Sequence, residues 1–361
     1  MRTGRALCLV VVAGCGRLAF DETGAVDAPT QAANTIFVTS TTKRPDLIGS
    51  LAGADAMCME RAAAVGLQET FVAWMSTTTV DAIDRLGDAR GWRRIDGLPF
   101  ADTIEDIQAG AILYPASLDE SGDEVGGWPP VATGTNEVGR FDPVVGTCGD
   151  WTTTTGVTYY GSINAASTGF TAYSQTTCSE AMHVYCMGID RQRSVMPPPE
   201  SGRKAFVAPL WTPGGGLASA DAHCQATASS AGLDGTFKAL LASSTGSAAS
   251  RFDLQGPRWV RTDGILLADT ATDFMAGRRH TGIQVAANGT SYFEDEVVWT
   301  GSSSTGSFDL DSTTAGAHCA DWTTTSGSAG TGVAGDRRVS LFDAIYPLPC
   351  SSAHLLYCLE T

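Results

Sequence analysis

The sequence lacks the patterns that would assign it to several common classes of protein. It contains no Cys-x-x-Cys pair, which argues against a structural zinc site. It contains no Gly-x-Ser-x-Gly elbow for a serine nucleophile. It is poor in basic residues, with 23 Lys and Arg against 39 Asp and Glu, and a net charge of −16 repels nucleic-acid phosphates. We therefore expect a protein that is not an enzyme, has no cofactor and binds no nucleic acid.

A long apolar run is also missing at the N-terminus. The stretch Ala6–Val12 follows two arginines and is too short to cross a bilayer as a helix, so residues 1–15 are predicted to be an export signal. The four residues that end at Cys15 resemble a bacterial lipobox, in which Cys15 carries the lipid; an ordinary signal peptide is the alternative. Gly16, rather than Asp, follows that cysteine, which resembles the signal for default sorting to the outer membrane in Gram-negative lipoproteins. Residues 16–34 are predicted to be a flexible tether.

The remaining eight cysteines form two sets of four. The gaps are 90, 30 and 8 residues in the first set and 95, 31 and 8 in the second. In chain order the cysteines are Cys58, Cys148, Cys178, Cys186, Cys224, Cys319, Cys350 and Cys358. Matching sets indicate two copies of one disulfide-framed domain in an oxidising compartment, and four cysteines in each copy allow three pairings.

The repeat predicts the domain organisation. The first domain covers residues 35–189, a stiff Pro-rich linker covers residues 190–203, and the second domain covers residues 204–361. Because each copy mixes helical and strand patterns with many Gly, Ser and Thr residues, we expect an α+β fold with long loops.

The first elements of each copy follow the same plan. In the first copy a strand is expected over residues 35–39 and a helix over 51–65, with Ser50 as its N-cap and Gly66 at its end. A further apolar segment covers residues 71–75, and a second helix capped by Thr79 is expected over 80–86. The expected elements of the second copy are a strand over 205–208, a helix over 217–230 ended by Gly232, an apolar segment over 237–241 and a last strand over 355–358.

Three sequence runs carry a resemblance to a known family. The runs Gly49–Ser76 and Gly216–Leu241, each with its helix cysteine, and the later Val298–Ser302, resemble the endostatin-like domain of collagens XV and XVIII. The first copy is more divergent at Val131–Thr135. That family has a C-type-lectin-like fold, so the resemblance implies two tandem domains of this fold. Its nested bonding implies the pairs Cys58–Cys186, Cys148–Cys178, Cys224–Cys358 and Cys319–Cys350.

Polar residues that recur in both copies are candidates for duplicated ligand sites or for structural contacts. These pairs are Asp55/Asp221, Arg85/Arg251, Arg94/Arg261, Asp96/Asp263 and Asp150/Asp321, beside Trp92/Trp259 and Trp151/Trp322. Since they accompany the cysteines in each copy, the structural interpretation is favoured.

Metal and catalytic candidates are sparse. The five histidines, His183, His223, His280, His318 and His354, have no counterpart in the other copy. Two acidic runs could offer oxygen ligands to calcium, although a solvated loop is the simpler interpretation. Their residues are Asp119, Glu120, Asp123 and Glu124, then Glu294, Asp295 and Glu296. The basic islands Arg278-Arg279-His280 and Arg337-Arg338 are too small to predict polyanion binding.

Together these features predict a surface lipoprotein at the outer membrane or cell surface that binds a protein or a glycan without catalysis. A structural envelope protein without a discrete ligand, or an exported hydrolase on the same fold, are the alternatives. Two copies on one tether would allow avidity. The ligand, its calcium dependence and the oligomeric state are left open by the sequence.

Overall fold

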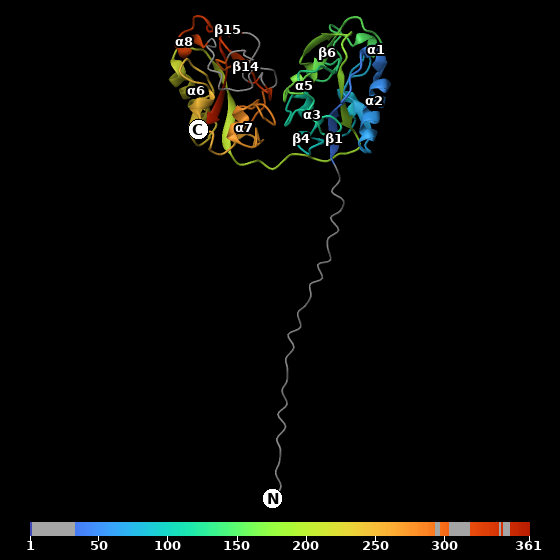
Figure 1. The fold of residues 1–361 in the computed structure, drawn as a ribbon, viewed down its shortest axis with the longest axis horizontal. Helices are drawn as coiled ribbons and strands as arrows, with labels where there is room; N and C mark the ends of the chain where they lie inside the picture. The colour runs from blue at the N-terminus through green and yellow to red at the C-terminus, as the bar shows by residue number, and fades with distance from the viewer. Residues whose placement is uncertain (2–32, 293–296, 303–317, 339–340, 342–346) are drawn as a thin grey trace. The chain divides into compact units, whose positions relative to one another are not determined.

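The computed structural model describes the chain apart from residues 2–32, 293–296, 303–317, 339–340 and 342–346 (Figure 1). It is a mixed α+β structure in which residues 33–361 form one compact unit. Cys15 and the acidic run Glu294–Glu296 lie outside the described residues. Among the described residues, every helix is too short or too polar to span a bilayer.

The N-terminal half contains an eight-stranded sheet, coloured blue to green in Figure 1. Its elements are β1 (Asn34–Val38), α1 (Pro45–Ile48), α2 (Leu51–Ala64), β2 (Phe71–Ala73), η1 (Ile83–Leu86), β3 (Trp92–Arg94), β4 (Pro99–Ala101), α3 (Ile104–Gln108), β5 (Val131–Ala132), α4 (Cys148–Trp151), β6 (Val157–Gly161), α5 (Gly169–Ala172), β7 (Ser174–Thr177) and β8 (His183–Gly188). The strand order is β4-β3-β1-β8-β5-β6-β7, and β2 also pairs with β8.

The C-terminal half repeats this plan in a six-stranded sheet and has a separate two-stranded sheet of β13 and β15. Its elements are β9 (Arg203–Trp211), α6 (Gly216–Ser230), β10 (Phe237–Ala239), η2 (Ala249–Arg251), β11 (Trp259–Arg261), α7 (Ala271–Met275), β12 (Val297–Trp299), α8 (Cys319–Trp322), β13 (Ser328–Ala329), β14 (Thr331–Val333), β15 (Leu348–Pro349) and β16 (His354–Glu360). The order β11-β9-β16-β12-β14, with β10 beside β16, matches β3-β1-β8-β5-β6 and β2. The strand directions match as well, since β1 and β9 run parallel to β3 and β11 but antiparallel to β8 and β16.

The first predicted helix of each copy is present, as α2 and α6. Ser50 caps α2 by accepting a hydrogen bond from the backbone N–H of Gly53, and Gly66 follows the helix with φ +81°. The expected second helix over 80–86 is wrong, because only the 3-10 turn η1 forms there. The Ser76 hydroxyl accepts from the N–H of Ala82, the bond that a Thr79 cap would make, and the N–H of Ile83 donates to Gly139 O instead of the Thr79 carbonyl.

Four disulfides fasten the two halves internally. Cys58 joins Cys186 and Cys224 joins Cys358, which fixes α2 and α6 to the central strands β8 and β16. Cys148 joins Cys178, and Cys319 joins Cys350. These are the pairs that the family resemblance implied. In a chain-entropy account, each long-range bond stabilises its half by about 4–5 kcal/mol.

The two short turns α4 and α8 have a left-handed backbone. In α4 the φ angles of Cys148, Asp150 and Trp151 are 54°, 53° and 70°, and α8 repeats them at 53°, 55° and 65°. A left-handed turn costs about 1–2 kcal/mol for each non-glycine residue. The disulfide, the burial of the tryptophan and its indole N–H bond to the Ser76 carbonyl at 2.7 Å offset that cost. No local pattern in the sequence predicts this conformation.

The two halves contact each other through equivalent segments. Ala165 and Asp336 form an antiparallel bridge, and each lies 14 residues after the tryptophan of its left-handed turn. The N–H of Ala166 donates to Gly335 O at 2.8 Å, and the N–H of Arg337 donates to Asn164 O at 3.1 Å. This reciprocal pairing is the pattern of a two-fold symmetric interface.

Side chains extend this interface between the halves. The Gln284 amide donates to the carbonyls of Ile112 and Ala166, both at 2.8 Å. An apolar cluster of Leu113, Tyr114 and Ile265 packs beside it. The Pro-rich linker that joins the halves is fastened at both ends, by the Val195 N–H to Asp102 and by the Glu200 N–H to Gly264 O.

Candidate functional site

The duplicated Asp–Arg pairs fasten a helix to a strand. Asp55 on α2 accepts two hydrogen bonds from Arg85, at 2.7 and 2.6 Å, and one from the N–H of Ala73 at 2.8 Å. Asp221 and Arg251 repeat these contacts in the C-terminal half. Since both partners are occupied by the fold, the structural interpretation of these residues is confirmed.

The other duplicated residues also have structural partners. Arg94 pairs with Asp96, and Arg261 with Asp263, across the turn that follows β3 or β11. Asp150 accepts from the N–H and hydroxyl of Thr78, and Asp321 repeats this with Ser244. The duplicated tryptophans, Trp92, Trp151, Trp259 and Trp322, are fully buried.

The first acidic run does not gather its carboxylates around one point. Asp119 accepts from the N–H groups of Ser121 and Asp123, and buried Glu120 accepts from Ser40. Glu124 extends to arginines of the other half. Within the described residues, no group of three or more His, Cys, Asp or Glu side chains could hold a metal ion.

The five histidines have separate environments. His183 and His223 contact backbone carbonyls, and His280 contacts Asp269 at 3.0 Å. His318 accepts from the N–H of Asp321, and His354 packs edge-on against Trp299. Over the described residues, no histidine hydrogen-bonds to a Ser or Cys side chain, so a nucleophile–base pair is not formed there.

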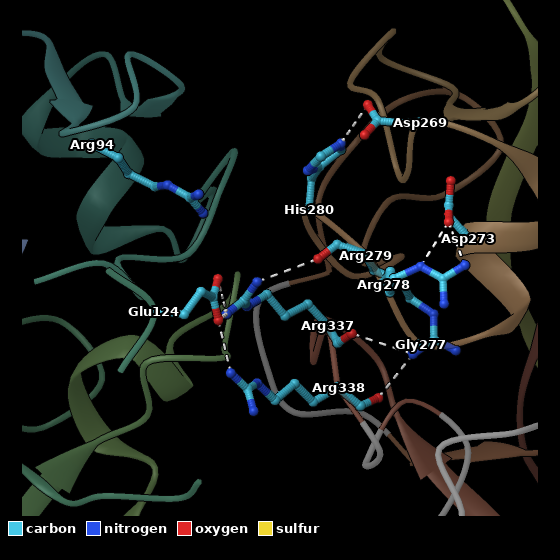
Figure 2. Close-up of a pocket in the computed structure, with 10 residues that line it drawn as sticks. All are labelled: Arg94, Glu124, Asp269, Asp273, Gly277, Arg278, Arg279, His280, Arg337 and Arg338. Carbon is cyan, nitrogen blue, oxygen red and sulfur yellow. Dashed lines mark hydrogen bonds and ion pairs between the residues drawn. The ribbon is translucent and has the colours of Figure 1, made fainter. Parts of the chain in front are cut away.

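The two basic islands meet in one pocket of about 490 Å³, which we call the arginine pocket (Figure 2). It is lined by Arg94, Glu124, Asp269, Asp273, Gly277, Arg278, Arg279, His280, Arg337 and Arg338. Five arginines and a histidine therefore face three carboxylates, so this pocket is positive in a chain that is acidic overall. Each basic island alone is too small to predict the binding of an anion, but the two islands together form one cationic surface.

Buried contacts hold the arginines in place. Arg279 lies over the ring of Phe274 and donates to the carbonyls of Arg337 and Arg338 at 3.3 and 3.1 Å. Arg337 donates in return to the carbonyl of Arg279 at 3.3 Å. Only 5% of Arg279 and 6% of Arg337 are exposed, so the two islands fix each other through guanidinium–carbonyl bonds.

Glu124 of the N-terminal half closes one side of the pocket. Its two carboxylate oxygens accept from Arg337 at 2.8 and 2.6 Å, and one also accepts from Arg338 at 2.8 Å. Figure 2 shows both arginines extending toward this carboxylate. Burial alone would raise the pKa of Glu124, but Arg337 and Arg338 outweigh it and hold that pKa below its ordinary value.

The arginines remain charged at neutral pH. Burial lowers the pKa of Arg279 to about 10, which is still well above neutrality. Burial also lowers the pKa of Arg337, and the Glu124 carboxylate opposes that effect. The pocket can therefore hold an anionic group by charge and by several N–H donors at once.

Four of the five pocket arginines lie in the C-terminal half and have no counterpart in the other copy, whereas Arg94 is repeated as Arg261. By the matching hydrogen bonds after α3 and α7, Arg278, Arg279 and His280 correspond to Ala111, Ile112 and Leu113. By their distance from the left-handed turns, Arg337 and Arg338 correspond to Ala166 and Ser167. The repeated fold forms without these cations, so their presence in one copy is not a requirement of the fold.

Sequence reasoning placed the two basic islands but missed the pocket. The islands are 58 residues apart and Glu124 is a further 155 residues away, so only the tertiary structure brings them together. The signal in the sequence was a difference between the two copies, because these basic residues in one copy correspond to apolar or small residues in the other. In comparisons with known proteins, no family model matches the chain and no curated protein is similar to it.

Proposed function

We propose that the chain is an exported, lipid-anchored binding protein that recognises acidic glycans through the arginine pocket. The observation that carries this proposal is the gathering of five arginines at one pocket of an acidic chain. Guanidinium groups form paired hydrogen bonds with planar carboxylates and with tetrahedral oxyanions. The ligand class that fits is a sugar with a carboxylate group, and the binding involves no bond cleavage.

The compartment and fold in this proposal rest on two supports. Four disulfides fit an oxidising environment outside the cytosol. The matching strand orders and nested disulfides support two tandem C-type-lectin-like, endostatin-like domains, at residues 35–189 and 204–361. Cys15 would carry the lipid that holds the protein at the outer membrane or cell surface.

An exposed tryptophan is compatible with a glycan ligand. Seven of the eight tryptophans are buried, but Trp128 is 49% exposed. It lies four residues after Glu124 on the loop between Asp119 and β5. Exposed aromatic rings offer an apolar face with a polar edge, which suits the face of a sugar ring.

A glycan array with soluble residues 16–361 tests the proposal, with calcium and with a chelator. We expect binding of glycans that carry uronic or sialic acid, in both conditions, and loss of that binding in Arg338→Gln. Arg44→Gln is the control, because Arg44 forms an exposed ion pair with Asp46 far from the pocket in sequence. A blank array would leave a protein ligand or a structural envelope role, and binding lost only with chelator would indicate a calcium site instead.

A further inference from the structure

We infer that Glu124 is an internal ligand of the arginine pocket and that an external carboxylate binds there by displacing it. This inference rests on the proposed function and names both the ligand group and the regulation of the same site. The occupied state is the one in the structure, where one carboxylate accepts three hydrogen bonds from two arginines. The pocket is therefore complementary to a planar carboxylate.

Glu124 can leave the arginines without a change of backbone. Its backbone is held by a bridge to Leu118, and in the turn between them the Asp119 carboxylate accepts from the N–H groups of Ser121 and Asp123. The Glu124 side chain is 45% exposed, whereas that of Arg337 is only 7% exposed. A rotation of the glutamate side chain toward solvent would break its bonds to the arginines and the bond from the Ser117 hydroxyl, while Arg337 stays held by its own bond to the Arg279 carbonyl.

The repeated fold does not require a carboxylate at this position. The turn that precedes Glu124 closes with Asp119 N–H to Asp123 O, and its equivalent closes with Ala286 N–H to Thr290 O. Glu124 therefore corresponds to Ser291. Both sides of this ion pair, the glutamate and the two arginines, are absent from the equivalent places of the other copy. A ligand site that is blocked by an internal competitor needs both the arginines that bind the ligand and a carboxylate that competes for them. Arg337, Arg338 and Glu124 supply these groups in one copy.

The charge balance of the site allows the Glu124 carboxylate to be exchanged for the carboxylate of a ligand. Glu124 is one carboxylate shared by two guanidinium groups, Arg337 and Arg338. Asp269 and Asp273 on the far wall are already paired with His280 and Arg278. When the Glu124 carboxylate turns away, Arg337 and Arg338 lose the anion that they share. The carboxylate of an external ligand would then take its place.

The test is a calorimetric titration of trigalacturonate into residues 16–361 at low ionic strength. We expect Glu124→Gln to bind this probe about fivefold more tightly than the wild type, since it removes a competing, partly exposed ion pair. Asp123→Asn is the matched control, because it removes one acidic charge from the adjacent residue, and its affinity should stay within twofold. The methyl ester of the probe should bind neither protein.

The outcomes separate the inference from the proposed function. Equal affinity of wild type and Glu124→Gln would overturn the internal-ligand inference and leave the proposed function intact. No binding to either protein would overturn both. A gain in Glu124→Gln that persists when Arg337→Gln is added would also refute the inference, because the gain must act through the arginine. A gain in affinity does not arise from misfolding, so these results are interpretable.

Discussion

Substitution of Asp55 by Ala should strongly destabilise the N-terminal half. The change leaves Arg85, whose side chain is 10% exposed, without its counter-ion, and the N–H of Ala73 without its acceptor. Removal of one partner of a buried ion pair costs about 3–5 kcal/mol, and the 30% exposure of Asp55 reduces our expectation to about 2–3 kcal/mol. Asp55→Asn keeps an acceptor for Ala73 and should lose less.

Urea unfolding without reductant measures this effect through the buried tryptophans Trp74, Trp92 and Trp151. Asp46→Ala is the control, because the Arg44–Asp46 pair is exposed and its loss should change the free energy of unfolding by about 0.5 kcal/mol or less. Asp221→Ala should reproduce the loss in the C-terminal half. A cost for Asp55→Ala as small as that of the control would refute the assigned role of the pair.

Three further predictions concern the turns, the interface and the ligand. Gly134→Ala should cost about 2 kcal/mol or more in thermal unfolding, because Gly134 has φ +58° and a Cβ would lie 2.8 Å from the Trp151 ring; an unchanged melting temperature would contradict this. The stability difference between wild type and Glu124→Gln should hold from neutral pH to about pH 5 and vanish as acid protonates Glu124, whose pKa is depressed; a difference that persists at pH 2 would refute it. Cleavage at a protease site placed over Pro197–Pro199 should leave the halves associated in gel filtration, and separate elution would show that the interface depends on the linker.

Much of the fold could be predicted because its signals are local or repeated. The opening strands and the helices α2 and α6 follow from β-branched runs, the Ser50 cap and the spacing of Cys58 and Cys224. The predicted 80–86 helix failed because the Ser76 hydroxyl accepts from the N–H of Ala82 and the Gly139 carbonyl accepts from the N–H of Ile83. Local propensity gives way where side chains from other segments accept the same hydrogen bonds.

The left-handed turns could not be predicted from local preference. Cys and Trp disfavour this backbone, and tertiary contacts stabilise it. The arginine pocket was unpredictable for a related reason, since its walls come from four segments that are distant in the sequence. What the sequence does contain is the contrast between copies: shared polar residues such as Asp55 and Asp221 are structural, and unshared ones such as Arg337 line the pocket.

The central claim is that the arginine pocket holds a carboxylate of an acidic glycan. A crystal structure of residues 16–361 soaked with trigalacturonate tests it most directly. We expect a ligand carboxylate within hydrogen-bonding distance of the Nη atoms of Arg337 and Arg338, with the Glu124 side chain turned toward solvent. Ligand density at another surface, with Glu124 still bound to both arginines, would contradict the claim.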